Sequence, residues 1–274
     1  MPTIAELLQK GDLSGAMGMA RSEVDRHPSD QGARFVLFEL LMIHDDFDTA
    51  CDQIKALGKV SPEGSGTIDF WLGLVDAERH RHRFLSTGQG SMAFLAKPPP
   101  WVRGFCDAAA AVCKQPSAAT ATILANAWKS VPTVTGWIDG VAFRSMRDAD
   151  EVVGPFLEAL VPGRWCWIPF AQISAVRFDA PRGFQDVIWR PAQVSLADGP
   201  DLRVWVPSLY SGTGARSNDE KLARLTTFEY PAQGICRGYG QRDLRVNDAL
   251  LQGILSIQSI VVDQAGAQRG NAMS

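Results

Sequence analysis

A repeated pattern of 34 residues in the first half of the chain constrains its fold more than any other feature. The segment Gly11–Pro28 aligns without a gap with the segment Asp45–Pro62. The aligned pairs are Leu13 with Phe47, Ala16 with Ala50, Met17 with Cys51, Ala20 with Ile54, and the two prolines. Thirty-four residues is the length of a tetratricopeptide helix pair, in which a small alanine lets two helices approach closely and a proline ends a helix.

Apolar residues between these markers predict a second helix in each repeat, over Asp30–Ile43 and Thr67–Ala77. The triple proline Pro98–Pro100 predicts an extended connection, after which a weaker third match ends at Pro132. We therefore predict a tetratricopeptide-like stack of about three helix pairs over residues 1–132. Such stacks present a groove that binds peptides or helices, although a stack that serves only for self-association is an alternative.

From Thr133 onward the sequence period changes to that of β-structure. The segments 133–138 and 141–146, joined by Asp139-Gly140, predict a hairpin with a type I′ turn. Further strands are predicted at 164–170, 174–178, 186–188, 193–196, 202–206 and 256–262, with a turn at 238–240 and a helix at 219–225. The predicted fold class is α+β with two domains: helical repeats over 1–132, then a β-rich domain, a small sheet or partly open barrel, over 133–263. The tail 264–274 is predicted to be flexible.

Composition and charge exclude several function classes. The net charge is −3 and is spread evenly over both halves, so no basic face for nucleic acid is predicted. The chain has neither a secretory signal pattern nor an apolar run of about 18 residues, so we expect no membrane insertion. Five cysteines without CxxC spacing predict reduced thiols and a cytoplasmic protein.

The titratable residues do not predict catalysis. All histidines lie in the helical half, and His80 and His82 are two residues apart, so their rings point to different helix faces and cannot chelate one metal. The acids of Asp148-Ala-Asp150-Glu151 are best explained as turn caps. We therefore predict no catalytic residue, no cofactor and no metal. A hydrolase or transferase of unknown substrate in the β-rich domain remains an alternative, which needs a perturbed acid or base in a concave site.

Residue types say more about binding. The second half holds 13 arginines but a single lysine, together with five of the eight tryptophans. Arginine and tryptophan are enriched at the centres of protein interfaces, where lysine is depleted. Two candidate surfaces follow: a strand-end cluster of Trp189, Arg190, Tyr210 and Arg242, and the inner face of the repeats with Phe38 and Phe70. An alternative stays open, in which Asp186 and Glu229 pair with the arginines and make the cluster a structural lock between strands.

Several linked motifs, in the same order along the chain, resemble the ImpE/TagJ (SciE) family of accessory proteins of bacterial type VI secretion. Besides the N-terminal repeats, they are the segments 136–143, 148–150, 154–158, 167–173, 181–192, 206–210 and 238–242. The chain departs from the family at Leu222–Phe228, where a glycine and an aspartate are lost. The resemblance implies a cytoplasmic, non-catalytic adaptor. It also implies binding to the N-terminal helical segment of the small sheath subunit TssB, and a link to sheath assembly or to disassembly by the ClpV ATPase. It does not indicate an oligomeric state.

Overall fold

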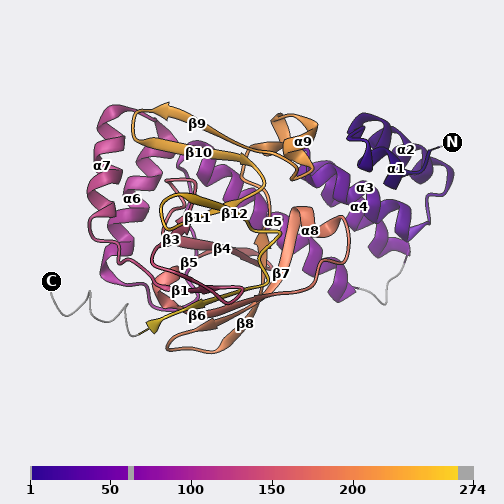
Figure 1. Cartoon of the computed structure of the whole chain (residues 1–274). Coiled ribbons are helices and arrows are strands. Elements are labelled where there is room, and N and C mark those ends of the chain that lie inside the picture. The colour runs from indigo at the N-terminus through magenta and orange to yellow at the C-terminus, as the bar shows by residue number, and fades with distance from the viewer. Residues whose placement is uncertain (1, 61–64, 265–274) are drawn as a thin grey trace.

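The first half of the chain folds into helices that lie beside one another (Figure 1). The computed structural model describes residues 2–60 and 65–264. The helices are α1 (Ile4–Gln9), α2 (Leu13–Arg26), α3 (Gln31–Met42), α4 (Phe47–Val60), α5 (Ser65–Thr87), α6 (Pro100–Lys114) and α7 (Ala118–Trp128). The predicted helices of the repeats correspond to α3 and α5, and α5 continues ten residues beyond the predicted end at Ala77. The repeat proline Pro62 lies outside the described residues.

The repeat markers occupy the positions that the sequence assigned to them. Ala16 and Ala50, which align in the repeat, are both fully buried. Asp12 and Asp30 precede α2 and α3, and each accepts a hydrogen bond from the backbone N–H three residues later. Such caps satisfy N–H groups that a helix cannot pair internally, and they fix where each helix begins.

The second half is built of antiparallel strands. One sheet has eight strands in the order β2-β1-β13-β6-β7-β8-β4-β5, and two small sheets have the orders β10-β9 and β12-β11-β3. The strands are β1 (Gly136–Ile138), β2 (Val141–Phe143), β3 (Met146–Asp148), β4 (Phe156–Val161), β5 (Arg164–Pro169), β6 (Ile173–Phe178), β7 (Trp189–Leu196), β8 (Asp201–Pro207), β9 (Thr226–Ala232), β10 (Ile235–Gly240), β11 (Asp243–Val246), β12 (Leu250–Gly253) and β13 (Ser259–Val262). The predicted α+β fold class, helical first and β-rich second, is confirmed.

The turn of the first hairpin matches the prediction. Asp139 and Gly140 have φ of 48° and 81°, the positive values that a type I′ turn requires at both central residues. The strand predicted at 186–188 is wrong, because Gln185–Ile188 forms the short helix α8. The turn predicted at 238–240 is also wrong, because these residues end β10. Gly238 is needed there for space, since a Cβ would lie 2.4 Å from the ring of Tyr210.

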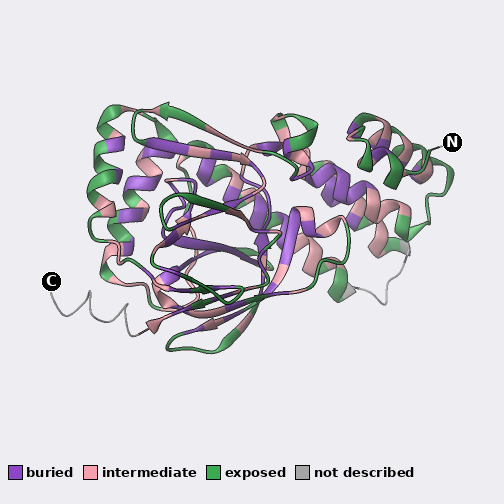
Figure 2. Cartoon of the chain, viewed as in Figure 1, coloured by how far each residue is buried: buried purple, intermediate pink, exposed green. Residues whose placement is uncertain are grey.

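The two halves share one hydrophobic core. A single cluster of buried side chains runs from Leu7 in α1 to Ile235 in β10, and a second cluster lies within the sheets. Helix α5 lies along β4 and β5, and Figure 2 shows this central region as mostly buried. The last helix of the first half, α7, ends at Trp128, and the first strand, β1, begins at Gly136. The division into two domains near residue 132 stays a prediction, and the predicted flexible tail lies outside the described residues from 265 onward.

Candidate functional site

The strand-end cluster lies in the interior. Trp189, Arg190 and Arg242 are each 1% exposed, and Tyr210 is 3% exposed. Buried arginines and a buried tyrosine require hydrogen-bond partners, because leaving such groups unpaired in a low-dielectric interior costs several kcal/mol. The contacts of these side chains therefore define what the cluster does.

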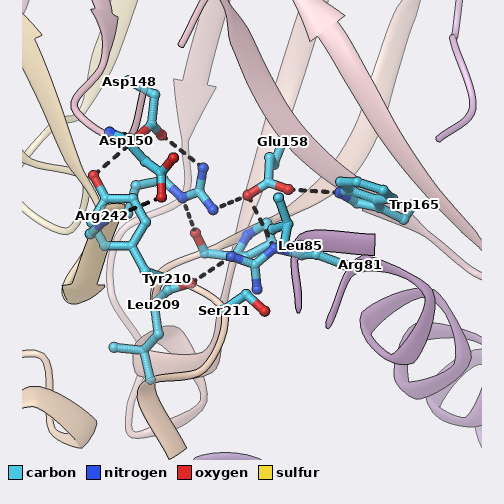
Figure 3. Close-up of polar contacts among 12 residues, drawn as sticks. Arg81, Leu85, Asp148, Asp150, Glu158, Trp165, Leu209, Tyr210, Ser211 and Arg242 are labelled. Atoms are coloured by element: carbon cyan, nitrogen blue, oxygen red, sulfur yellow. Dashed lines mark hydrogen bonds and ion pairs between the residues drawn. The ribbon is translucent and has the colours of Figure 1, made fainter. Parts of the chain in front are cut away.

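Arg242 belongs to a chain of alternating charges that we call the buried ion network: Glu78, Arg81, Asp148, Glu158 and Arg242. Its Nη1 lies 2.8 Å from a carboxylate oxygen of Asp148, and its Nη2 contacts Glu158. Glu158 also accepts a hydrogen bond of 3.1 Å from Nε of Arg81, and Arg81 in turn pairs with Glu78. Figure 3 shows how Glu158 lies between the two guanidinium groups. Because Glu78 and Arg81 come from α5 and the others from the β-half, the network joins the two halves.

Aromatic donors complete the buried ion network. The indole N–H groups of Trp165 and Trp167 both donate to one oxygen of Glu158, at 2.8 and 3.3 Å. Trp189 donates to Glu78 at 3.0 Å, and the hydroxyl of Tyr210 lies 3.1 Å from Asp148. Three of the six predicted partner-binding residues, Trp189, Tyr210 and Arg242, thus serve as hydrogen-bond donors to buried carboxylates.

The two carboxyl groups that contact Arg242 have pKa values shifted in opposite directions. Burial raises the pKa of Asp148 to about 7, against the opposing effect of Arg242. Burial acts in the same direction on Glu158, but the guanidinium groups of Arg242 and Arg81 outweigh it and hold its pKa at about 2. Glu158 is therefore the anionic centre of the buried ion network.

Arg190 forms a separate clamp. Its Nη1 donates to the backbone carbonyls of Ile254 and Ile257 at 2.7 and 2.6 Å, and its guanidinium lies over the ring of Phe178. The prediction that Asp186 and Glu229 pair with these arginines is wrong. Asp186 accepts hydrogen bonds from the backbone N–H groups of Arg182 and Gly183, and Glu229 pairs with Arg216 on the surface. The idea of a structural lock nevertheless describes the cluster, with different acids.

The second candidate surface is covered by the chain itself. Phe38 is fully buried, and its ring centroid lies 6.3 Å from that of Trp189. Phe70 is half-buried and packs edge-to-face on Trp205 at 4.7 Å. The helical face that carries both rings thus packs against β7 and β8. A role in partner binding stays a prediction for all six residues, and in this structure their contacts are internal.

One constellation touches on the alternative of a hydrolase. The fold brings Ser211 of the β-half to His82 of α5, with Oγ 3.4 Å from Nδ1, while a carboxylate oxygen of Asp45 lies 3.9 Å from the same Nδ1. A serine–histidine–aspartate relay needs the serine and the carboxylate on opposite ring nitrogens, and here both approach one. Among the described residues no group of three histidine, cysteine or acidic side chains could hold a metal ion, and no helix there is long and apolar enough to cross a membrane.

Sequence reasoning missed the buried ion network. Asp148 and Asp150 do cap their turn, because each accepts a hydrogen bond from the backbone N–H two residues later. Each also pairs with an arginine, Asp148 with Arg242 and Asp150 with Arg237. The available signal was Glu158, an acid flanked by the apolar residues Leu157 and Ala159, since an acid in an apolar segment needs a cationic partner when the segment is buried.

Comparisons with known proteins agree with this fold and add a family. Residues 140–261 match the family model described as ImpE protein. The type VI secretion system accessory component TagJ of Pseudomonas aeruginosa is 28% identical over 224 residues, which cover 81% of this chain and 79% of that protein. An X-ray structure of a Vibrio parahaemolyticus protein superposes with a TM-score of 0.85 at 20% identity, covering 95% of this chain and 97% of that one. The last comparison establishes the fold alone.

Proposed function

We propose that the chain, which matches the ImpE family model over residues 140–261 and is similar to TagJ along most of its length, is a non-catalytic adaptor of a bacterial type VI secretion machine. The observation that carries the proposal is the similarity to TagJ along most of both chains, since TagJ is named as an accessory component of that machine. The proposed place of action is the bacterial cytoplasm, where the sheath of the machine is assembled and taken apart.

The proposed partner is the N-terminal helical segment of the small sheath subunit TssB. Through it the protein is linked to sheath assembly or to disassembly by the ClpV ATPase. Two features support a binding role. The scaffold is tied together by the buried ion network and a shared core, so it is rigid enough to hold a binding surface in shape. The one serine–histidine–aspartate constellation has both oxygens at one ring nitrogen, which does not favour the hydrolase alternative.

Calorimetric titration tests this function. We expect the full chain to bind a synthetic peptide of the TssB N-terminal helix from the same bacterium with micromolar affinity, about −8 kcal/mol. The matched control is a peptide of the same composition in scrambled order, which cannot present apolar residues at i, i+3, i+4 and i+7. Equal heats for both peptides, or no binding at high micromolar concentration, would exclude the proposed partner.

A further inference from the structure

A cavity lies away from the buried ion network, where α6 and α7 meet the β-half. It has a volume of about 590 Å³, and Trp101, Trp128 and Arg147 contribute to its lining. A second cavity of about 190 Å³ lies beside it. Trp101, Pro132 and Ala171 line both, so the two form one continuous depression that we call the Trp101 groove. An elongated groove fits an extended or helical segment better than a compact small molecule.

Unsatisfied hydrogen-bond donors gather at one end of the Trp101 groove. Within the described residues, four buried side-chain nitrogens have no hydrogen-bond acceptor, and two of them, Nε1 of Trp128 and Nη1 of Arg147, belong to residues that line it. A third is Nε of Arg245, which lies directly opposite Arg147 in the β11–β3 register. Buried donors without an acceptor are rare in native proteins. Because these nitrogens have almost no accessible surface, they lie beneath the wall of the groove and not in its opening.

The charges in the lining indicate where an anionic ligand could be held. The lining contains two arginines, Arg144 and Arg147, and two acids, Glu151 and Asp248. Arg147 is already paired, because its Nη1 lies 2.9 Å from a carboxylate oxygen of Glu151 and its guanidinium lies 5.2 Å from the ring centroid of Trp128. Arg144 is exposed, and no partner of its side chain is found among the described residues. Arg144 is therefore the cation of the lining that is left for a carboxylate of a ligand.

The floor of the groove is apolar and aromatic. Trp101 packs on Phe156, and the ring of Trp128 lies so close to Gly154 that a Cβ there would come within 2.2 Å of it. Both indoles are held by the core and only half-buried, so they are rigid aromatic anchors. Rigid tryptophans with neighbouring arginines are the residue types that dominate interface energetics.

We propose that the Trp101 groove is the docking site for an acidic amphipathic helix, which lays apolar side chains against Trp101 and Ala171 and a carboxylate against Arg144. The inference rests on the proposed function for the identity of the helix, the N-terminal segment of the sheath subunit. The groove itself follows from the two cavities, the half-buried tryptophans in their lining and the unpaired Arg144. It differs from both surfaces that the sequence indicated, which are internal.

Two variants test the groove, one at the exposed Arg144 and one at the half-buried Ala171, which also packs against the core of the sheets. Arg144→Glu reverses an exposed charge, and Ala171→Trp fills the point that both cavities share. The matched control is Arg177→Glu, an exposed arginine of β6 that lines neither cavity. Two probes are titrated into each protein: the TssB helix peptide, and hydrocinnamate, an aromatic carboxylate, with its neutral amide as the control compound. Circular dichroism and melting temperature establish that each variant is folded.

We expect the peptide to bind wild type and Arg177→Glu alike, and to bind Arg144→Glu and Ala171→Trp about tenfold more weakly. Hydrocinnamate is expected to bind wild type weakly and more tightly than its amide, with binding lost in both groove variants. Equal peptide affinity in all four proteins would overturn the groove and leave the proposed function intact. If the peptide fails on wild type while hydrocinnamate distinguishes the variants, the groove stands as a carboxylate site and the sheath partner falls. If neither probe binds, both proposals fail.

Discussion

Glu158 is the residue on which the interior depends most. It is fully buried and accepts hydrogen bonds from two arginines and two tryptophans. Glu158→Gln keeps the shape but removes the charge between Arg81 and Arg242. Because breaking a buried pair leaves an uncompensated charge, we expect a loss of about 3–5 kcal/mol in the free energy of unfolding, measured by denaturant titration. The control is Glu229→Gln, which removes a surface ion pair and is expected to leave the unfolding midpoint unchanged.

The buried carboxyl group of Glu39 predicts that the stability of the fold depends on pH. It is 8% exposed, and burial together with the charge of Asp186 raises its pKa from 4.5 to about 7. Since the folded state favours the protonated form, the free energy of unfolding falls as the pH rises from 4.5 towards 7. Glu39→Gln removes this loss, so we expect stabilisation of about 1–2 kcal/mol above neutrality and none at pH 4. Thermal melts at both pH values check it, and a pH-independent effect would contradict it.

At the scale of elements, helix α5 is one of the helices that join the two halves, and it packs on β4 and β5. Its Gly73 accepts a hydrogen bond of 2.8 Å from the backbone N–H of Gly163, in the turn between β4 and β5. A Cβ at Gly73 would lie 2.9 Å from Pro162 and 3.0 Å from the Gly163 backbone nitrogen. Gly73→Val is therefore expected to push α5 from the sheet and to lower the melting temperature by about 5 °C or more. This loss is expected even though valine is a better helix former than glycine.

The matched control for Gly73→Val is Gly104→Val in α6, where a Cβ would meet nothing within 4 Å. Both variants carry the same small gain in helix propensity, because glycine is a poorer helix former than valine. The difference between their melting temperatures therefore isolates the close approach of α5 to the β4–β5 turn. Equal melting temperatures for the two variants would show that the contact contributes nothing.

The elements that sequence could predict are those with local causes. The helices that carry the repeat alanines and the Asp139-Gly140 turn depend on residues close together in the sequence, and both are where the pattern places them. Gly238 resembles a turn residue, yet it lies in a strand because a ring from a distant segment needs its space. The burial of Trp189 and Tyr210 could not be predicted either, because their hydrogen-bond partners Glu78 and Asp148 are over 60 residues away in the sequence. Contacts between segments far apart in the sequence decide whether such residues are buried or lie in a strand, and these contacts cannot be predicted from a single sequence.

At the scale of the whole molecule, the chain has a helical part and a β-rich part, but the interactions that stabilise it are shared between the two. Helix α7 ends at Trp128 and strand β1 begins at Gly136, but side chains from both parts form one buried cluster. The buried ion network crosses the same boundary through Arg81, whose guanidinium contacts Glu158 and the backbone carbonyl of Leu209. Separating the parts would expose both the apolar cluster and unpaired buried charges.

We therefore expect one cooperative unfolding transition, despite the change of structural class along the chain. Far-ultraviolet circular dichroism reports mainly on the helices, and tryptophan fluorescence is dominated by residues at the junction such as Trp165 and Trp189. In denaturant, the midpoints from the two signals should coincide. A fragment of residues 133–263 should remain unfolded alone, because Glu158 would keep only one of its two arginines and β4 would lose the cover of α5. Separate midpoints with a folded fragment would instead establish two domains of independent stability.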